Sequence, residues 1–102
     1  MPTALAAAQK RYLRTLAHPL SPVLLVGAKG VTPAILAELD AVLDQHELIK
    51  VRVDAGDRET RDAWIAALVK GSDAVLVQRV GHVASLYRPR PKDPAIVLPR
   101  RG

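Results

Sequence analysis

The sequence predicts an α/β fold, a compact two-layer sandwich with three helices and a mixed four-stranded sheet. Apolar residues recur at helical spacing in three segments, and two short apolar runs lie between these segments. A strand–turn–strand pattern follows the third segment. The predicted order is therefore helix, strand, helix, strand, helix, strand, strand. Its β-α-β units require right-handed crossovers, with helices covering at least one face of the sheet.

The first helix is expected to begin at an N-cap on Thr3 and to run to about Leu16. One apolar stripe supports it, at spacings of three and four: Leu5, Ala8, Tyr12 and Leu16. His18 and Pro19 end the helix, because a residue before proline is driven out of the α region. Three basic residues lie off the stripe: Lys10, Arg11 and Arg14.

An apolar strand over residues 23–26 leads into the four-residue loop Gly27-Ala28-Lys29-Gly30. Thr32 and Pro33 then open a helix to about residue 45, with threonine as N-cap and proline in the first turn. Glycines allow a ligand to come close to the backbone, and a helix N-terminus favours an anion. Lys29 adds a formal charge at the tip, so this loop is our candidate phosphate contact.

Alternating apolar and basic residues predict a half-buried strand over residues 48–53. Asp57 is expected to cap a third helix that runs to about Val69 and is closed by Gly71. Two strands, 74–80 and 84–88, are then joined through Gly81-His82 as a hairpin.

The 102 residues suffice for one hydrophobic core, which we expect over residues 1–90. Residues 91–102 form a proline-rich basic tail, expected to be extended or disordered. The chain has no cysteine and no signal-type or membrane-spanning apolar run. We therefore expect a soluble, cytoplasmic protein without a membrane partner.

Charge is segregated along the chain. Residues 1–37 carry four basic residues and no acid, and residues 38–62 carry eight acids against four bases. Residues 63–102 carry seven bases against two acids, giving a net charge of +5 for the whole chain. One positive face and one acidic face are expected, so that a polyanion would meet part of the surface. A merely solvated surface is the alternative.

Enzyme classes find no support in the residue pattern. The glycine loop is too short for a Walker motif, and no serine lies in a nucleophile elbow. His18, His46 and His82 lie in separate segments without metal-ligand spacing. We expect neither an enzyme, nor a cofactor, nor a small-molecule substrate.

Several segments together resemble the CRM (chloroplast RNA splicing and ribosome maturation) domain, in register over about residues 8–90. They are Leu16-Ala17-His18-Pro19-Leu20, the stretch from Val26 to Thr32, Glu47-Leu48-Ile49-Lys50-Val51 and Leu86-Tyr87-Arg88-Pro89. The resemblance is closest to bacterial stand-alone members. It implies a fold like the C-terminal domain of translation initiation factor three, and association with precursors of the large ribosomal subunit. It also implies that Gly27, Ala28, Lys29 and Gly30 contact the RNA backbone.

Five further residues are expected to extend this RNA-binding surface: Lys10, Arg11, Arg14, Arg58 and Arg61. For the two on the third helix, ion pairs with Glu59 and Asp62 are the structural alternative. With three aromatic residues in the chain, binding should depend on backbone and shape rather than base stacking. Two other functions stay open: a module whose acidic second helix, with Glu38 and Asp44, docks on a ribosomal protein, and an architectural DNA-binding protein.

Overall fold

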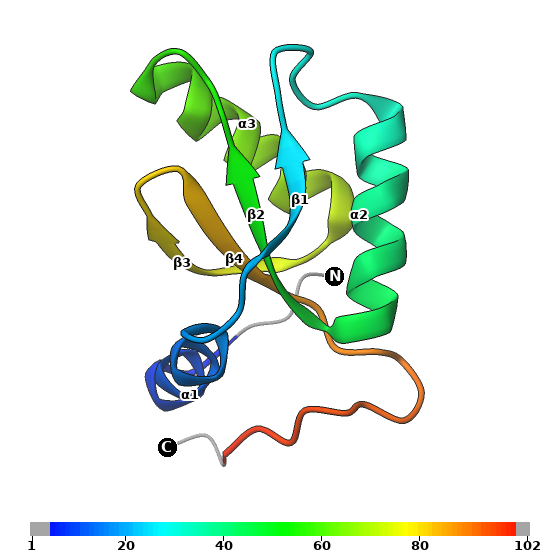
Figure 1. Cartoon of the computed structure of the whole chain (residues 1–102). Coiled ribbons are helices and arrows are strands. Elements are labelled where there is room, and N and C mark those ends of the chain that lie inside the picture. Colours follow the sequence, from blue (N-terminus) through cyan, green and yellow to red (C-terminus); the bar gives the residue numbers. More distant parts are fainter. Residues whose placement is uncertain (1–4, 100–102) are drawn as a thin grey trace.

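The computed structural model describes residues 5–99 and has the predicted order of elements (Figure 1). Its helices are α1 (Ala7–Ala17), α2 (Pro33–His46) and α3 (Arg58–Ser72). Its strands are β1 (Pro22–Val26), β2 (Leu48–Val53), β3 (Val75–Val80) and β4 (Val83–Tyr87). The predicted α/β class and element order are thus confirmed.

The strands form one mixed sheet in the order β1-β2-β4-β3. β1 and β2 are parallel, with α2 as the crossover, and β4 pairs antiparallel with both β2 and β3. The β3–β4 turn at Gly81-His82 reaches the end of β2, where the Val53 N–H donates to the His82 carbonyl at 2.7 Å. The loop after β1, the loop after β2 and this turn therefore lie at the same end of the strands. We call this end of the sheet the loop end.

Helices cover the two faces of the sheet unequally. α2 and α3 cover one face, where strand residues such as Val26, Val51 and Leu86 are buried in the main core. α1 covers one end of the other face, and its Leu13 packs in a second cluster with Leu48 and Tyr87. The rest of that second face carries exposed or half-buried side chains on β1, β2 and β3, whereas those of β4 are half-buried or buried. We call this part of the sheet the open face.

The prediction for the first helix is wrong in its start and only partly right in its stripe, of which Leu5 and Leu16 pack on the second cluster. α1 follows an N-cap at Ala6, whose N–H donates to the Gln9 side chain at 3.0 Å, and Thr3 lies outside the described residues. Gln9, Leu13 and Ala17 are buried, whereas Tyr12 is 40% exposed. Two neighbouring rows of this helix have apolar character, and periodicity alone does not decide which row meets the sheet.

The N-terminal caps of the other helices are confirmed. The Thr32 hydroxyl accepts from the Ile35 N–H at 3.2 Å, and the Asp57 carboxylate accepts from the Thr60 N–H at 2.8 Å. The predicted closure at Gly71 is wrong, because α3 continues to Ser72 and Asp73 adopts the left-handed cap conformation. Gly71 lies instead where α2 and α3 approach closely: a β-carbon there would be 2.8 Å from a methyl carbon of Leu36.

Beyond Arg88 the chain runs to Pro99 without helix or strand among the described residues. This segment is held by the Glu47 carboxylate, which accepts from the N–H groups of Arg90, Ala95 and Ile96 at 2.8, 2.7 and 2.9 Å. Ile96 also packs on the second cluster. The boundary at residue 90 stays a prediction.

Candidate nucleic-acid interface

The loop between β1 and α2 is a tight turn with an exposed tip. The Gly30 N–H donates to the Gly27 carbonyl at 2.9 Å, which closes the turn over Ala28 and Lys29. Both tip residues are exposed, and their backbone N–H groups have no hydrogen-bond partner within residues 5–99. Two free amides and an ammonium group at one tip are suited to phosphate oxygens.

Gly30 is fixed by the fold itself. Its φ of +71° is unfavourable for residues with a β-carbon. A β-carbon there would also lie 3.1 Å from two ring carbons of Trp64. The indole of α3 thus supports the loop from below, so Trp64 positions the loop besides filling the core. The sequence gives no signal of this contact between Trp64 and Gly30.

Gly27 differs from Gly30 in both respects. Its φ is not positive, and a β-carbon built on it would meet no atom within 4 Å. Nothing in the fold therefore requires glycine at this position. The open space over Gly27 is where a ligand could come into contact with the backbone.

The two arginines of α3 lie at the loop end. The Arg61 side chain donates to the Gly81 carbonyl at 3.4 Å, while its buried Nε atom has no partner. Arg58 is exposed at the start of the helix. Within residues 5–99 neither forms the intrahelical ion pair that was the alternative, and Asp62 pairs with Arg79 of β3 instead.

Two of the carboxylates at the loop end, Asp54 and Asp57, are engaged by the fold. Asp54 pairs with Arg52 at 2.9 Å. Hydrogen bonds from the Thr60 side chain and backbone, together with the Arg61 charge, lower the pKa of the Asp57 carboxyl below its usual value. Each of these two carboxylates therefore has a local donor that offsets its negative charge toward an approaching anion.

The three basic residues of α1 lie away from the loop. α1 precedes β1, whereas the loop follows it, so the five residues of β1 separate them by about 16 Å at 3.3 Å per residue. Figure 1 shows α1 at the opposite end of the sheet from the β1–α2 loop. The structure therefore places Arg58 and Arg61 at the same end of the sheet as the loop, with Arg61 at the β3–β4 turn, and it leaves Lys10, Arg11 and Arg14 on a separate part of the surface.

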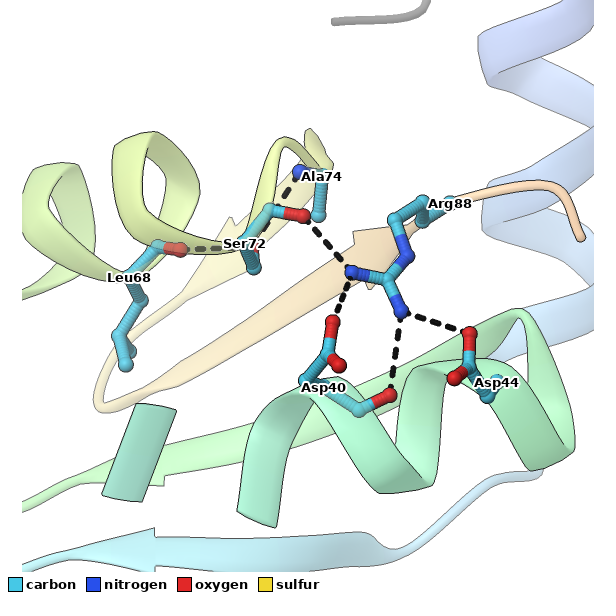
Figure 2. Close-up of polar contacts among 6 residues, drawn as sticks. All are labelled: Asp40, Asp44, Leu68, Ser72, Ala74 and Arg88. Carbon is cyan, nitrogen blue, oxygen red and sulfur yellow. Dashed lines mark hydrogen bonds and ion pairs between the residues drawn. The ribbon is translucent and has the colours of Figure 1, made fainter. Parts of the chain in front are cut away.

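The sequence analysis did not predict the role of two charged residues at the end of the sheet opposite the glycine loop. We call this end the clasp end. Figure 2 shows the Arg88 guanidinium between α2 and the end of α3. It donates to the Asp40 and Asp44 carboxylates at 2.6 and 2.9 Å, and to the Asp40 and Ser72 carbonyls at 3.1 and 2.9 Å.

Glu47 is the second of these residues. It is fully buried, with a φ of +62° directly after α2. Burial raises the pKa of its carboxyl, but the three backbone donors and the Arg90 charge outweigh burial, so that the pKa lies below its ordinary value of 4.5. An acid where a helix normally ends in glycine or asparagine is the signal that could have revealed it.

Two further properties of the described residues concern metal binding and membrane insertion. Residues 5–99 contain no cluster of three histidine or acidic side chains that could hold a metal ion. In the same part of the chain no helix has the length and apolar character needed to cross a membrane. Fold and site together define a small α/β domain with an exposed glycine turn and cationic side chains at its loop end.

Comparison with known proteins places this domain in a family. A model of the CRS1 / YhbY (CRM) domain matches residues 5–88, and the chain belongs to this family. It is 46% identical to an RNA-binding protein of Haemophilus influenzae over 97% of this chain and 99% of that protein. It is 42% identical to a probable RNA-binding protein of Pseudomonas aeruginosa, over 87% and 86% of the two chains. The expectation that the chain is not an enzyme is confirmed by this family.

A solved structure has the same fold. The solution structure of a Staphylococcus aureus protein, described there as a candidate RNA-binding protein, superposes with a TM-score of 0.80 at 32% identity. The match covers 94% of this chain and all of that chain.

Proposed function

We propose that the protein binds RNA by its sugar–phosphate backbone, through the loop Gly27–Gly30 and the adjacent Arg58 and Arg61. The observation that carries this proposal is the contrast within the loop. Gly30 is glycine because the fold requires it, whereas Gly27 is glycine with open space above it and two unpartnered amides beside it. A glycine at such an open position lets a ligand come close to the backbone. The RNA-binding proteins among its relatives support RNA as this ligand.

We further propose that the RNA is a precursor of large-subunit ribosomal RNA and that the protein acts in assembly of that subunit, in the cytoplasm. This step rests on the family resemblance of the sequence. Docking of acidic α2 on a ribosomal protein is the weaker proposal, because Asp44 is already bonded to Arg88 and its charge is partly offset.

The charge reversal Lys29→Glu tests the loop. The affinity for a transcribed fragment of large-subunit ribosomal RNA at low salt should fall about tenfold or more, equivalent to about 1.4 kcal/mol. Lys70→Glu, an exposed position in the last turn of α3, is the matched control and should change affinity much less. Equal affinities for wild type and Lys29→Glu would contradict the proposal, as would a preference for duplex DNA.

Cross-linking in cells followed by sequencing tests the identity of the RNA. We expect the reads to map to precursor large-subunit ribosomal RNA. Reads dispersed over messenger RNA would refute the assembly role and leave RNA binding intact. A ribosomal-protein complex that survives nuclease treatment and is lost on reversing Glu38 and Asp44 would favour the protein-docking alternative.

A further inference from the structure

We infer that a single-stranded segment of the bound RNA lies across the open face of the sheet, in a groove between α1 and the β3–β4 hairpin. This inference rests on the proposed function and adds a second contact surface to it. The residues that carry it are Arg14, His18, Lys50, Arg52 and Gln78.

The groove consists of two hollows that share His18 and Gln78, which makes them continuous. Arg11 and Arg14 of α1 line the first hollow. Lys50 of β2 lines the second. No aspartate or glutamate lines either hollow. A groove with cations and amide donors but no acid is complementary to a polyanion.

The strand register extends this groove toward the glycine loop. Lys50 and Arg52 alternate with the buried residues of β2, so both project from the open face. Lys50 lies opposite Ser85 of β4 and Arg52 lies opposite Val83, one step nearer the loop end. Cationic side chains thus follow one another from α1 across β2 toward the loop end, where the glycine loop carries Lys29. They connect the basic residues of α1 to the loop, from which the fold separates them.

The cations of this face are weakly engaged by the protein. The Lys50 ammonium makes one long hydrogen bond, 3.3 Å, to the His18 carbonyl. Arg52 pairs with Asp54, but both side chains are about half exposed, and exposed pairs contribute little to stability. Within residues 5–99 the side chains of Arg11 and Arg14 have no ion pair. They are available to phosphates, in contrast to Arg79 and Arg88 on the opposite face.

Exposed apolar side chains favour a single strand over a duplex. Leu25 is 54% exposed on β1, in the row of Arg52, and Val80 is 63% exposed on β3 in the same row. Unpaired bases and riboses can cover these side chains while the phosphates meet the cations. A duplex would present its phosphates to the same face and leave the apolar side chains uncovered.

The salt dependence of binding tests this inference. The probe is a uridine oligomer of about 16 nucleotides, the upper end of site sizes for small single-strand-binding domains. Each phosphate contact on a single strand contributes about 0.7 to the slope of log K against log salt. The double variant Arg14→Gln/Lys50→Gln should therefore reduce the slope by about 1.4. The control Lys70→Gln/Lys92→Gln removes the same number of exposed charges elsewhere and should leave the slope unchanged.

Two further variants separate the inference from the proposed function. Lys29→Gln in the same series should reduce the slope by about 0.7. Arg14→Gln alone removes an exposed charge that forms no ion pair within residues 5–99, and keeps the test valid if the double variant unfolds.

Equal slopes for the groove variants and the control would overturn the inference, while a reduced slope for Lys29→Gln would still support the loop. A loss confined to the groove variants would support the inference and refute the loop. Absence of any binding by the wild-type protein would overturn both. Binding of an acidic peptide at the groove would overturn the inference if RNA does not displace the peptide and Lys29→Gln does not weaken its binding. That result would assign the face to a protein partner.

Discussion

The two ends of the sheet use charged side chains in opposite ways. At the clasp end, Arg88 makes four hydrogen bonds to α2 and α3, and Glu47 accepts three from the chain that follows β4. At the loop end, Lys29 and Arg58 have no partner within residues 5–99, and Arg61 has one long contact. β2 joins the two ends over six residues, about 20 Å.

This difference separates charges that stabilise the fold from charges that are available to a ligand. At the clasp end the protein satisfies its own charges, so substitutions there should reduce stability and leave the affinity of folded protein for RNA unchanged. At the loop end the fold gains little from the charges, so substitutions should reduce affinity and leave stability unchanged.

The largest effect is expected for Glu47→Ala. Removing a buried carboxylate leaves three backbone N–H groups without their acceptor, and the free energy of unfolding should fall by about 3 kcal/mol. Urea denaturation measures it, with Glu38→Ala on the exposed side of α2 as control. A loss equal to that of the control would show that the Glu47 bonds contribute nothing.

The same residue predicts a dependence of stability on pH. The pKa of Glu47 is lower in the folded than in the unfolded protein, so its contribution is present above the ordinary value of 4.5 and is lost as the pH falls through the folded pKa. The unfolding free energies of wild type and Glu47→Ala should therefore converge as the pH is lowered below 4.5. A difference that stays constant to the lowest pH would contradict the assignment.

A smaller effect is expected for Arg88→Lys. The ammonium group keeps the charge but cannot replace the planar fork that reaches two carboxylates and two carbonyls. Asp40 and Asp44 are largely exposed, which screens the Coulombic part, so we expect a loss of about 2 kcal/mol from the hydrogen bonds. Arg58→Lys is the matched control and should leave the melting temperature unchanged.

The smallest effects on stability are expected within the loop. The two glycines should differ there: substitution of Gly30 should mainly reduce stability, and substitution of Gly27 should mainly reduce RNA affinity. Gly30→Ala places a β-carbon at positive φ and against Trp64, which should cost about 1–2 kcal/mol. Gly27→Ala meets no atom and should change stability by less than about 0.5 kcal/mol, while it weakens RNA binding. A destabilised Gly27→Ala variant, or one with wild-type affinity, would remove the argument for a ligand at this glycine.

The sequence predicted those features that local chemistry determines. The side chains of Thr32 and Asp57 each accept a hydrogen bond from the backbone N–H three residues later, as expected for N-caps. The alternation of apolar and basic residues along β2 predicted its buried face. It failed where tertiary packing decides. The buried row of α1 depends on which side meets Leu48 and Tyr87, and the end of α3 depends on how closely Gly71 approaches Leu36.

For the candidate site, the sequence located the loop and its lysine but not their surroundings. The contact of Gly30 with Trp64 and the bonds of Arg88 to Asp40 and Asp44 join residues more than 30 positions apart, which no local pattern contains. The groove along Lys50 and Arg52 depends on the strand order β1-β2-β4-β3, which is a property of the whole sheet.

The most direct measurement is the titration of isotope-labelled protein with the ribosomal RNA fragment, following backbone amide resonances at low salt. Our account predicts the largest shifts at the Ala28 and Lys29 amides, and little change at Glu47 and Arg88. Unchanged loop amides at saturating RNA, or shifts centred on the clasp end, would contradict it.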